Sequence, residues 1–133
     1  MKIGAIAKAC GVGIDTLRYY EKEGLIRPVS RTDAGYREYD DRTIREMEFI
    51  LKAKALGFSL QEIRELLSVR IDREHHPCSD VKNMAEAKLA RIEEKIDELQ
   101  RMHSTLKRIS DMCCGGPEPA THCSILDALE KSA

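Results

Sequence analysis

The sequence has no tryptophan, only two phenylalanines and no long apolar run. So few aromatic residues argue against a large β-sheet and favour a mainly helical fold. No segment approaches the roughly 18 consecutive apolar residues that a membrane-spanning helix needs. The start of the chain is too short, and too interrupted by Lys8, to be a signal peptide. We therefore expect a cytoplasmic protein that has no membrane partner.

An excess of charge of one sign is also missing. The 133 residues carry a formal net charge of −1, although 34% of them are charged. The overall field of the protein therefore gives no support for nucleic-acid binding, and any DNA contact must come from a local face.

Cysteine, in contrast, is well represented. One of the five cysteines, Cys10, stands alone, and the other four lie in the C-terminal half of the chain. Because cytoplasmic thiols stay reduced, these four indicate metal binding or redox chemistry before structural disulfides. Cys10 lies on the apolar face of a predicted helix, so we expect it to belong to the core.

Residues 1–69 are predicted to form a winged helix-turn-helix DNA-binding domain. Apolar residues at helical spacing over 3–10 stop at a glycine-containing turn, and a second helical pattern covers 14–22. Two short helices across such a turn are the helix-turn-helix arrangement. The turn residues within 28–39 suit a short hairpin, which we interpret as the wing.

Capping signals predict two further helices in this domain. Asp40 or Asp41 can cap a helix that Gly57 closes. Ser59 and Glu62 form a capping box that opens the next helix.

The DNA-contacting face is predicted on the second helix and the wing. The second helix of a helix-turn-helix lies in the major groove, while side chains around it contact phosphates. The predicted contact residues are Thr16, Arg18, Tyr19, Arg31, Tyr36 and Arg37. Each arginine alone would be interpreted as solvated surface charge, and only the cluster on adjacent elements favours DNA binding.

Residues 70–111 are predicted to form a polar connector and a long dimerisation helix. From about residue 79 the helix contains no glycine or proline, and apolar residues recur at alternating spacings of four and three. This seam is too narrow to bury the helix by itself, so the helix needs a partner. An antiparallel homodimeric coiled coil is the simplest solution, and packing onto the same chain's N-terminal domain is the alternative.

Residues 112–133 are predicted to form a metal-binding loop followed by a short helix. The loop holds Cys113, Cys114, His122 and Cys123, and thiolates and imidazoles are the ligands that zinc prefers. Three local thiols leave a tetrahedral shell incomplete. The alternative, that these cysteines are small buried hydrophobic residues, explains the combination less well.

Cys78 is a candidate for an additional ligand, because an antiparallel dimer can bring the start of one long helix beside the tail of its partner. His75 and His76 precede it and could form hydrogen bonds to the metal ligands without binding the ion themselves. A solvated connector is the favoured interpretation of these two histidines, since nothing in the spacing gives their direction.

Taken together, these segments resemble the MerR family of metal-responsive regulators over almost the whole chain. The stretches that carry the resemblance are 16–21, 24–26, 35–39, 49–50 and 56–60. The second half resembles the zinc-responsive branch of that family in particular, through residues 74–78, 113–115 and 123–126.

The resemblance implies an antiparallel dimer with one or two Zn(II) ions in each site between the chains. Cys78 of one chain would reach across to the loop of the other. The cysteine ligands it implies are Cys78, Cys113, Cys114 and Cys123. The zinc branch commonly has a loop histidine where this chain has Glu118, so His122 or Glu118 would complete the shell. A coordination shell with softer ligands would move the metal selectivity of the site toward cadmium or lead.

The implied function is metal-dependent activation of a metal efflux or resistance promoter with a palindromic operator. The bound regulator would distort a spacer that is otherwise too long for RNA polymerase holoenzyme. The same fold could instead sense cadmium, lead or thiol redox state, although an iron–sulfur cluster would need one more cysteine in the tail. The tail after Ser110 is too short for a drug-binding domain. No enzymatic activity is expected, because the sequence has no Cys-X-X-Cys redox motif.

Overall fold

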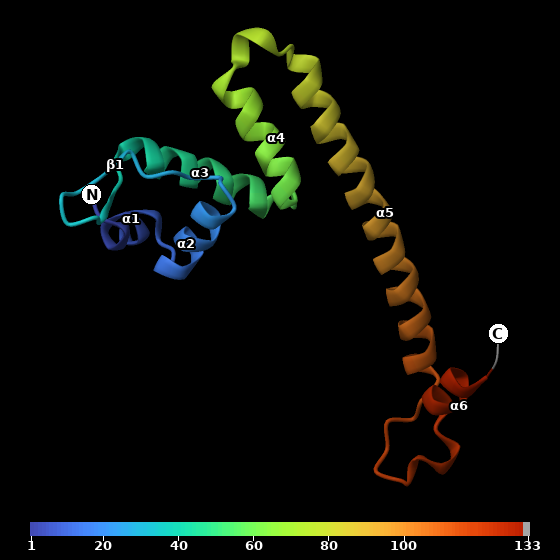
Figure 1. The fold of residues 1–133 in the computed structure, drawn as a ribbon. Coiled ribbons are helices and arrows are strands. Elements are labelled where there is room, and N and C mark those ends of the chain that lie inside the picture. The colour runs from blue at the N-terminus through green and yellow to red at the C-terminus, as the bar shows by residue number, and fades with distance from the viewer. Residues whose placement is uncertain (132–133) are drawn as a thin grey trace. The chain divides into compact units, whose positions relative to one another are not determined.

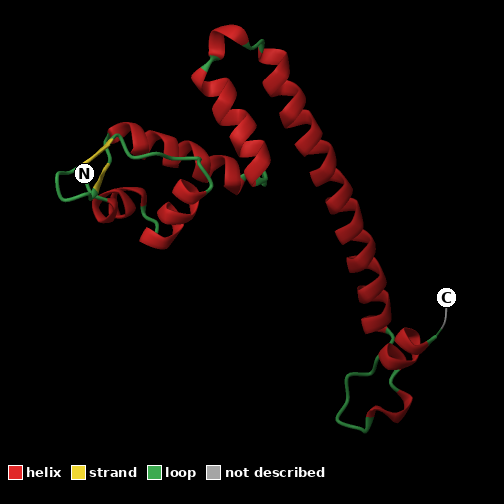
Figure 2. Ribbon diagram, in the orientation of Figure 1, coloured by secondary structure: helices red, strands yellow, loops and turns green. Residues whose placement is uncertain are grey.

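The computed structural model describes residues 1–131, and it is mainly helical, as the composition predicted (Figures 1 and 2). It divides into two compact units, Met1–Met84 and Ala85–Ala133.

The first unit is a winged helix-turn-helix domain with the start of the long helix. Its elements are α1 (Ile3–Cys10), α2 (Ile14–Lys22), β1 (Ser30–Arg31), β2 (Arg37–Glu38), α3 (Asp41–Ala55), α4 (Leu60–Ile71), a 3₁₀ turn at Arg73–His75, and the first residues of α5 (Cys78–Asp111). The two strands are antiparallel, and Arg31 pairs with Arg37 across the wing. The predicted helix-turn-helix and wing are therefore confirmed.

Local capping explains where these helices begin and end. Gly11 has a φ of 69° and ends α1, a conformation that glycine adopts without strain. Asp40 caps α3 by accepting a hydrogen bond from the backbone N–H of Arg42, 3.0 Å away. The predicted capping box of Ser59 and Glu62 is present at the start of α4. Both capping predictions are confirmed.

Two boundaries differ slightly from those expected. α4 continues to Ile71, two residues past position 69, because no glycine or proline stops it there. α5 begins at Cys78, one residue earlier than expected, because a proline just before the first helical turn removes no helical hydrogen bond.

The core of the first unit joins all four of its complete helices to the wing. Its fully buried side chains include Ile6, Leu17, Ile26, Tyr39, Met47, Ile50 and Ile63. α1 contacts both α2 and α3, and α3 contacts α4. Cys10 is partly buried against this core, as expected, and burial raises the pKa of its thiol.

The second unit holds most of α5, followed by the 3₁₀ turn Ala120–His122 and the short helix α6 (Ser124–Glu130). Along its described length, α5 has no buried residue. The apolar seam is therefore exposed to solvent in a single chain. Its large exposed members include Leu89, Ile92, Ile96, Leu99 and Leu106. Within residues 1–131, none of the helices has the length and apolar character needed to cross a membrane.

Candidate nucleic-acid interface and cysteine loop

The helical period of α2 separates a buried side from an exposed one. Leu17 and Tyr20 are buried in the core, whereas Arg18 and Tyr19 are exposed between them. Thr16 is only partly exposed. The three predicted contact residues of this helix therefore differ in their exposure to solvent, and Arg18 is the cation among them.

Four of the six predicted DNA-contacting residues gather around one shallow hollow of about 340 Å³. α2 and the wing supply most of its lining, and the start of the chain supplies the rest. The lining residues are Lys2, Ile3, Arg18, Arg31, Gly35, Tyr36 and Arg37. This local concentration of cations exists although the net charge of the chain is −1. Thr16 and Tyr19 do not line the hollow.

Lys2 is a cation of this face that the sequence analysis missed. Its Nζ lies 5.1 Å from the ring centroid of Tyr36, a cation–π distance. Nothing local in the sequence indicates this contact, because it forms only when the wing folds back over the start of α1.

A second residue that sequence reasoning missed is Glu21, which joins α2 to the wing. Its Oε1 accepts from Arg37 Nε at 2.8 Å, and its Oε2 accepts from the Tyr39 hydroxyl at 2.9 Å. Burial, together with this hydrogen bond, raises the pKa of Tyr39 to about 12. The hydroxyl therefore stays protonated and donates to Glu21 at neutral pH.

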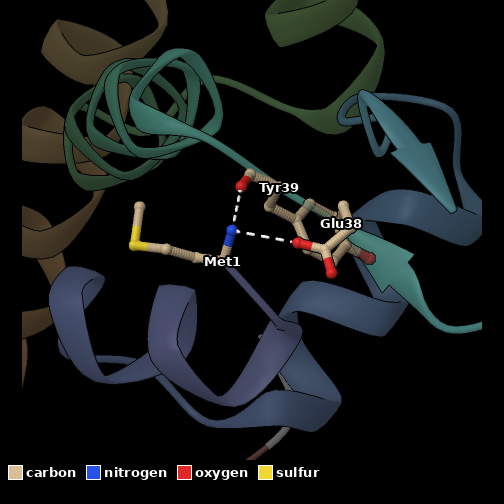
Figure 3. A network of polar contacts seen from close by, with 3 residues as sticks. All are labelled: Met1, Glu38 and Tyr39. Carbon is tan, nitrogen blue, oxygen red and sulfur yellow. Dashed lines mark hydrogen bonds and ion pairs between the residues drawn. The ribbon is translucent and has the colours of Figure 1, made fainter. Parts of the chain in front are cut away.

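The other side of the same wing strand contacts the start of the chain. Figure 3 shows the Met1 amino group donating to the carbonyl oxygen of Tyr39 and forming an ion pair with Glu38. The end of β2 is therefore held from two directions, by Met1 and by Glu21.

Arg64 fixes the C-terminal end of α2 to α4. Its Nη2 donates to both the backbone carbonyl and the carboxylate of Glu23, each at 2.9 Å. Thus α2 is held at this end by contacts to the wing and to α4 as well as by the core.

The cysteine loop follows the end of α5 and closes on itself. Gly115 reverses the chain with a φ of 69°, and Cys123 immediately precedes α6. The Ser124 hydroxyl donates to the carbonyl of Met112 at 2.8 Å, which joins the two ends of the loop. The loop therefore returns Cys123 to the neighbourhood of the helix end.

The predicted ligands of the loop line a hollow of about 370 Å³ within the second unit. The potential metal donors among its lining residues are Cys113, Cys114, Glu118, His122 and Cys123. All five loop residues named from the sequence therefore lie around one space.

Within this hollow the donors form two pairs. The backbone N–H groups of Leu126 and Ile125 lower the pKa of Cys123, and a side-chain hydrogen bond with Cys113 adds to the effect. Cys114 accepts from the Gly116 N–H at 3.5 Å and donates to a Glu118 oxygen at 3.9 Å. His122 lines the space from the 3₁₀ turn.

These pairs do not amount to a finished coordination shell. Among residues 1–131, no three Cys, His, Asp or Glu side chains are close enough together to hold a metal ion. The chemistry of the donor set nevertheless fits a thiophilic divalent ion, because three thiols, an imidazole and a carboxylate share one small space. Closure around an ion would need the two pairs to approach each other.

Cys78 lies in the first unit, exposed at the first position of α5. It lines an apolar hollow of about 570 Å³ together with His76. His75 is hydrogen-bonded to Asp72, and His76 forms a 3.5 Å ion-pair contact with an aspartate of the first α5 turn. The predicted approach of Cys78 to the loop involves a second chain, and it stays a prediction.

Comparison with known proteins places these features in a known group. A family model described as MerR HTH family regulatory protein matches residues 1–69, and one described as MerR, DNA binding matches residues 44–109. The HTH-type transcriptional regulator ZntR of Escherichia coli (strain K12) is 46% identical over 132 residues, which cover 99% of this chain and 94% of that regulator.

Solved structures agree with the sequence comparison. The lead(II) complex of the transcription regulator PbrR691 from Ralstonia metallidurans CH34 has a TM-score of 0.85 at 31% identity, covering 97% of this chain and 98% of that one. The mercury(II) complex of the regulator MerR from Bacillus megaterium MB1 has a TM-score of 0.72 at 33% identity, with coverages of 98% and 100%.

Proposed function

The chain belongs to the MerR family of DNA-binding transcription regulators, and from this premise we propose that it is a homodimeric activator that responds to Zn(II). The observation that carries the proposal is the gathering of three thiols, a carboxylate and an imidazole around one hollow after α5. The 46% identity to a regulator named ZntR supports a metal-responsive role and favours zinc.

The residues that would hold the ion come from both chains of the dimer. Cys78 opens α5 in the first unit, and the loop follows the end of α5 in the second unit. An antiparallel partner would bring the partner's loop to Cys78. A bound divalent ion would supply bonds to these thiolates and so link the two chains.

The loop residues of each chain would complete this shared shell. Cys113, Cys114 and Cys123 are the proposed thiolate ligands, and either His122 or Glu118 is the proposed fourth group from the loop. Glu118 accepts a 3.9 Å hydrogen bond from Cys114, whereas His122 forms no hydrogen bond with a loop thiol among the described residues, and this favours the carboxylate. Each site would hold one or two ions.

The proposed output is activation through promoter distortion. The cluster of Arg18, Arg31, Tyr36 and Arg37 would bind each half of a palindromic operator. Metal can change transcription only by binding the activating conformation more tightly than the inactive one. A site shared by two chains provides this preference, because its geometry depends on how the chains are arranged. The distorted duplex would then fit RNA polymerase holoenzyme at a metal efflux promoter.

A second candidate is a regulator of the same fold that responds to cadmium or lead. Two observations favour it: the three thiols around the loop hollow, and the high structural similarity to a regulator crystallised with lead(II). Ions larger and softer than zinc accept thiolate-rich shells readily. The two candidates differ only in the ion, so a single experiment separates them.

Anaerobic titration of the reduced protein with zinc, cadmium, lead and copper(I), followed by run-off transcription with each ion, tests the proposal. Zinc is expected to bind tightly and to give the strongest induction. Induction by cadmium or lead but not by zinc would select the second candidate. If no ion induces and mild oxidation does, the metal proposal is wrong, and the regulator senses thiol redox state instead.

A further inference from the structure

Glu21 is an acidic residue in an unexpected place. It lies on α2, the helix proposed to enter the major groove, and a carboxylate near DNA repels the phosphates. Its side chain is only 15% exposed, so it is held in the structure and not solvated at the surface. A charge kept in that position requires a structural reason.

The contacts of the carboxylate give that reason. Each of its oxygens has one partner from the wing, since Oε1 meets Arg37 Nε at 2.8 Å and Oε2 meets the Tyr39 hydroxyl at 2.9 Å. Tyr39 is only 2% exposed and cannot move without disturbing the core. The fixed hydroxyl therefore orients the carboxylate, and the carboxylate in turn orients the guanidinium.

The orientation leaves the outer part of Arg37 available. The ion pair uses Nε, and a guanidinium has two further NH₂ groups that can donate in parallel to a phosphate. The side chain of Arg37 is 45% exposed and lines the same hollow as Arg18 and Tyr36. One edge of the arginine thus faces Glu21, while its exposed part lies on the proposed DNA face.

We propose that Glu21 is a positioning residue for DNA binding, which holds Arg37 with its free NH₂ groups toward a backbone phosphate. The inference rests on the proposed phosphate contact of Arg37. Its consequence is opposite to that of simple electrostatics. Removing a negative charge near DNA should strengthen binding, whereas removing the group that orients Arg37 should weaken it.

Glu21→Gln in the full-length dimer tests this proposal, since it removes the charge and keeps the size. Binding to a promoter fragment that the wild-type protein recognises is measured over a series of salt concentrations. The affinity is expected to fall by at least about 10-fold, because a charged hydrogen bond is weakened in both subunits. The slope of log K against log salt should become less steep by about two, one phosphate contact for each subunit.

Asp15→Asn is the matched control, because Asp15 is an exposed acid on the same helix. It should leave the affinity unchanged or raise it slightly, with the salt slope preserved. Glu21→Asp provides a second test variant, which keeps the charge but withdraws the carboxylate by one methylene. It should also weaken binding if position matters more than charge. Thermal unfolding of each variant verifies that the domain remains folded.

Arg37→Ala distinguishes a failure of the positioning role of Glu21 from a failure of the proposed phosphate contact of Arg37. If it reduces the salt slope and Glu21→Gln adds no further loss in the double variant, the two residues act together as proposed. If Arg37→Ala reduces the slope while Glu21→Gln leaves both slope and affinity unchanged or improved, the positioning role of Glu21 is wrong. If Arg37→Ala itself changes neither quantity, the proposed phosphate contact is wrong and the inference fails with it.

Discussion

Replacing Cys114 with serine is expected to abolish metal-dependent transcription, while the metal-free protein still binds its operator. A serine hydroxyl is not deprotonated at neutral pH and is a poor ligand for a thiophilic ion. Loss of residues that merely support a metal ligand costs 10- to 100-fold in metal affinity, so loss of the ligand itself should cost more than about 100-fold.

The structure explains why this substitution should spare DNA binding. Cys114 is exposed and lies in the loop of the second unit, while the helix-turn-helix and wing belong to the first unit. Their core contains no loop residue. Metal titration and operator binding are measured on the same preparation, followed by run-off transcription with saturating zinc.

Cys10→Ala is the control for this prediction, since Cys10 packs against the core of the first unit and is not a proposed ligand. It should retain metal binding and induction. If zinc induces transcription as strongly with the Cys114→Ser protein as with the wild type, the cysteine loop does not sense the metal.

The second large effect is expected from Ile96→Lys in α5. Ile96 is near the middle of the helix and 47% exposed in the single chain, within a seam of exposed apolar side chains. In an antiparallel dimer both copies would be buried near the centre of the interface. Because about half of the side chain remains to be buried, losing about 0.7–1.4 kcal/mol of apolar burial in each copy would raise the dimer dissociation constant by about 10- to 100-fold.

Sedimentation equilibrium over a range of protein concentrations measures this change directly. Glu94→Lys is the control, because a residue two positions away from Ile96 lies on the opposite face of the helix from the apolar seam. The control should remain dimeric at concentrations where Ile96→Lys is monomeric. A dimer of unchanged strength in the Ile96→Lys protein would mean that α5 does not pair through this seam.

Much of the first unit could be predicted because its signals are local. The helix expected over 14–22 is α2 to the residue, and the capping box of Ser59 and Glu62 opens α4. Turn and capping chemistry act within a few residues and are therefore visible in sequence. Similarly, the lack of glycine and proline beyond residue 79 predicted a long helix, and α5 is that helix.

The contacts that organise the DNA face could not be predicted in this way. Lys2 meets Tyr36, and Glu21 meets Arg37 and Tyr39, only because the wing folds back over α1 and α2. Such pairs are separated by long stretches of chain, and helical or strand periodicity says nothing about them. The net charge of the chain gave no indication of the DNA face either, because acidic residues elsewhere cancel the charge of its cationic cluster.

The metal shell was predicted in composition but not in geometry. Sequence named the donors, but it did not indicate that Cys113 would contact Cys123 while Cys114 turned toward Glu118. The directions of neighbouring side chains in a loop depend on its backbone, which the reversal at Gly115 sets. The proposed complete shell also includes a ligand from a second chain. Its geometry therefore cannot be obtained from the sequence or the fold of one chain.

Each metal site is proposed to be shared between two chains, and mixed dimers distinguish a shared site from a site that one chain builds alone. A dimer is assembled from one Cys78→Ser chain and one Cys114→Ser chain, and its zinc content and affinity are compared with those of both mutant homodimers. A shared site predicts one damaged and one intact site in the mixed dimer. It should therefore bind half the zinc of the wild-type dimer with wild-type affinity, while neither homodimer binds zinc tightly. A mixed dimer as deficient as the two homodimers would mean that the metal site is not shared between the chains.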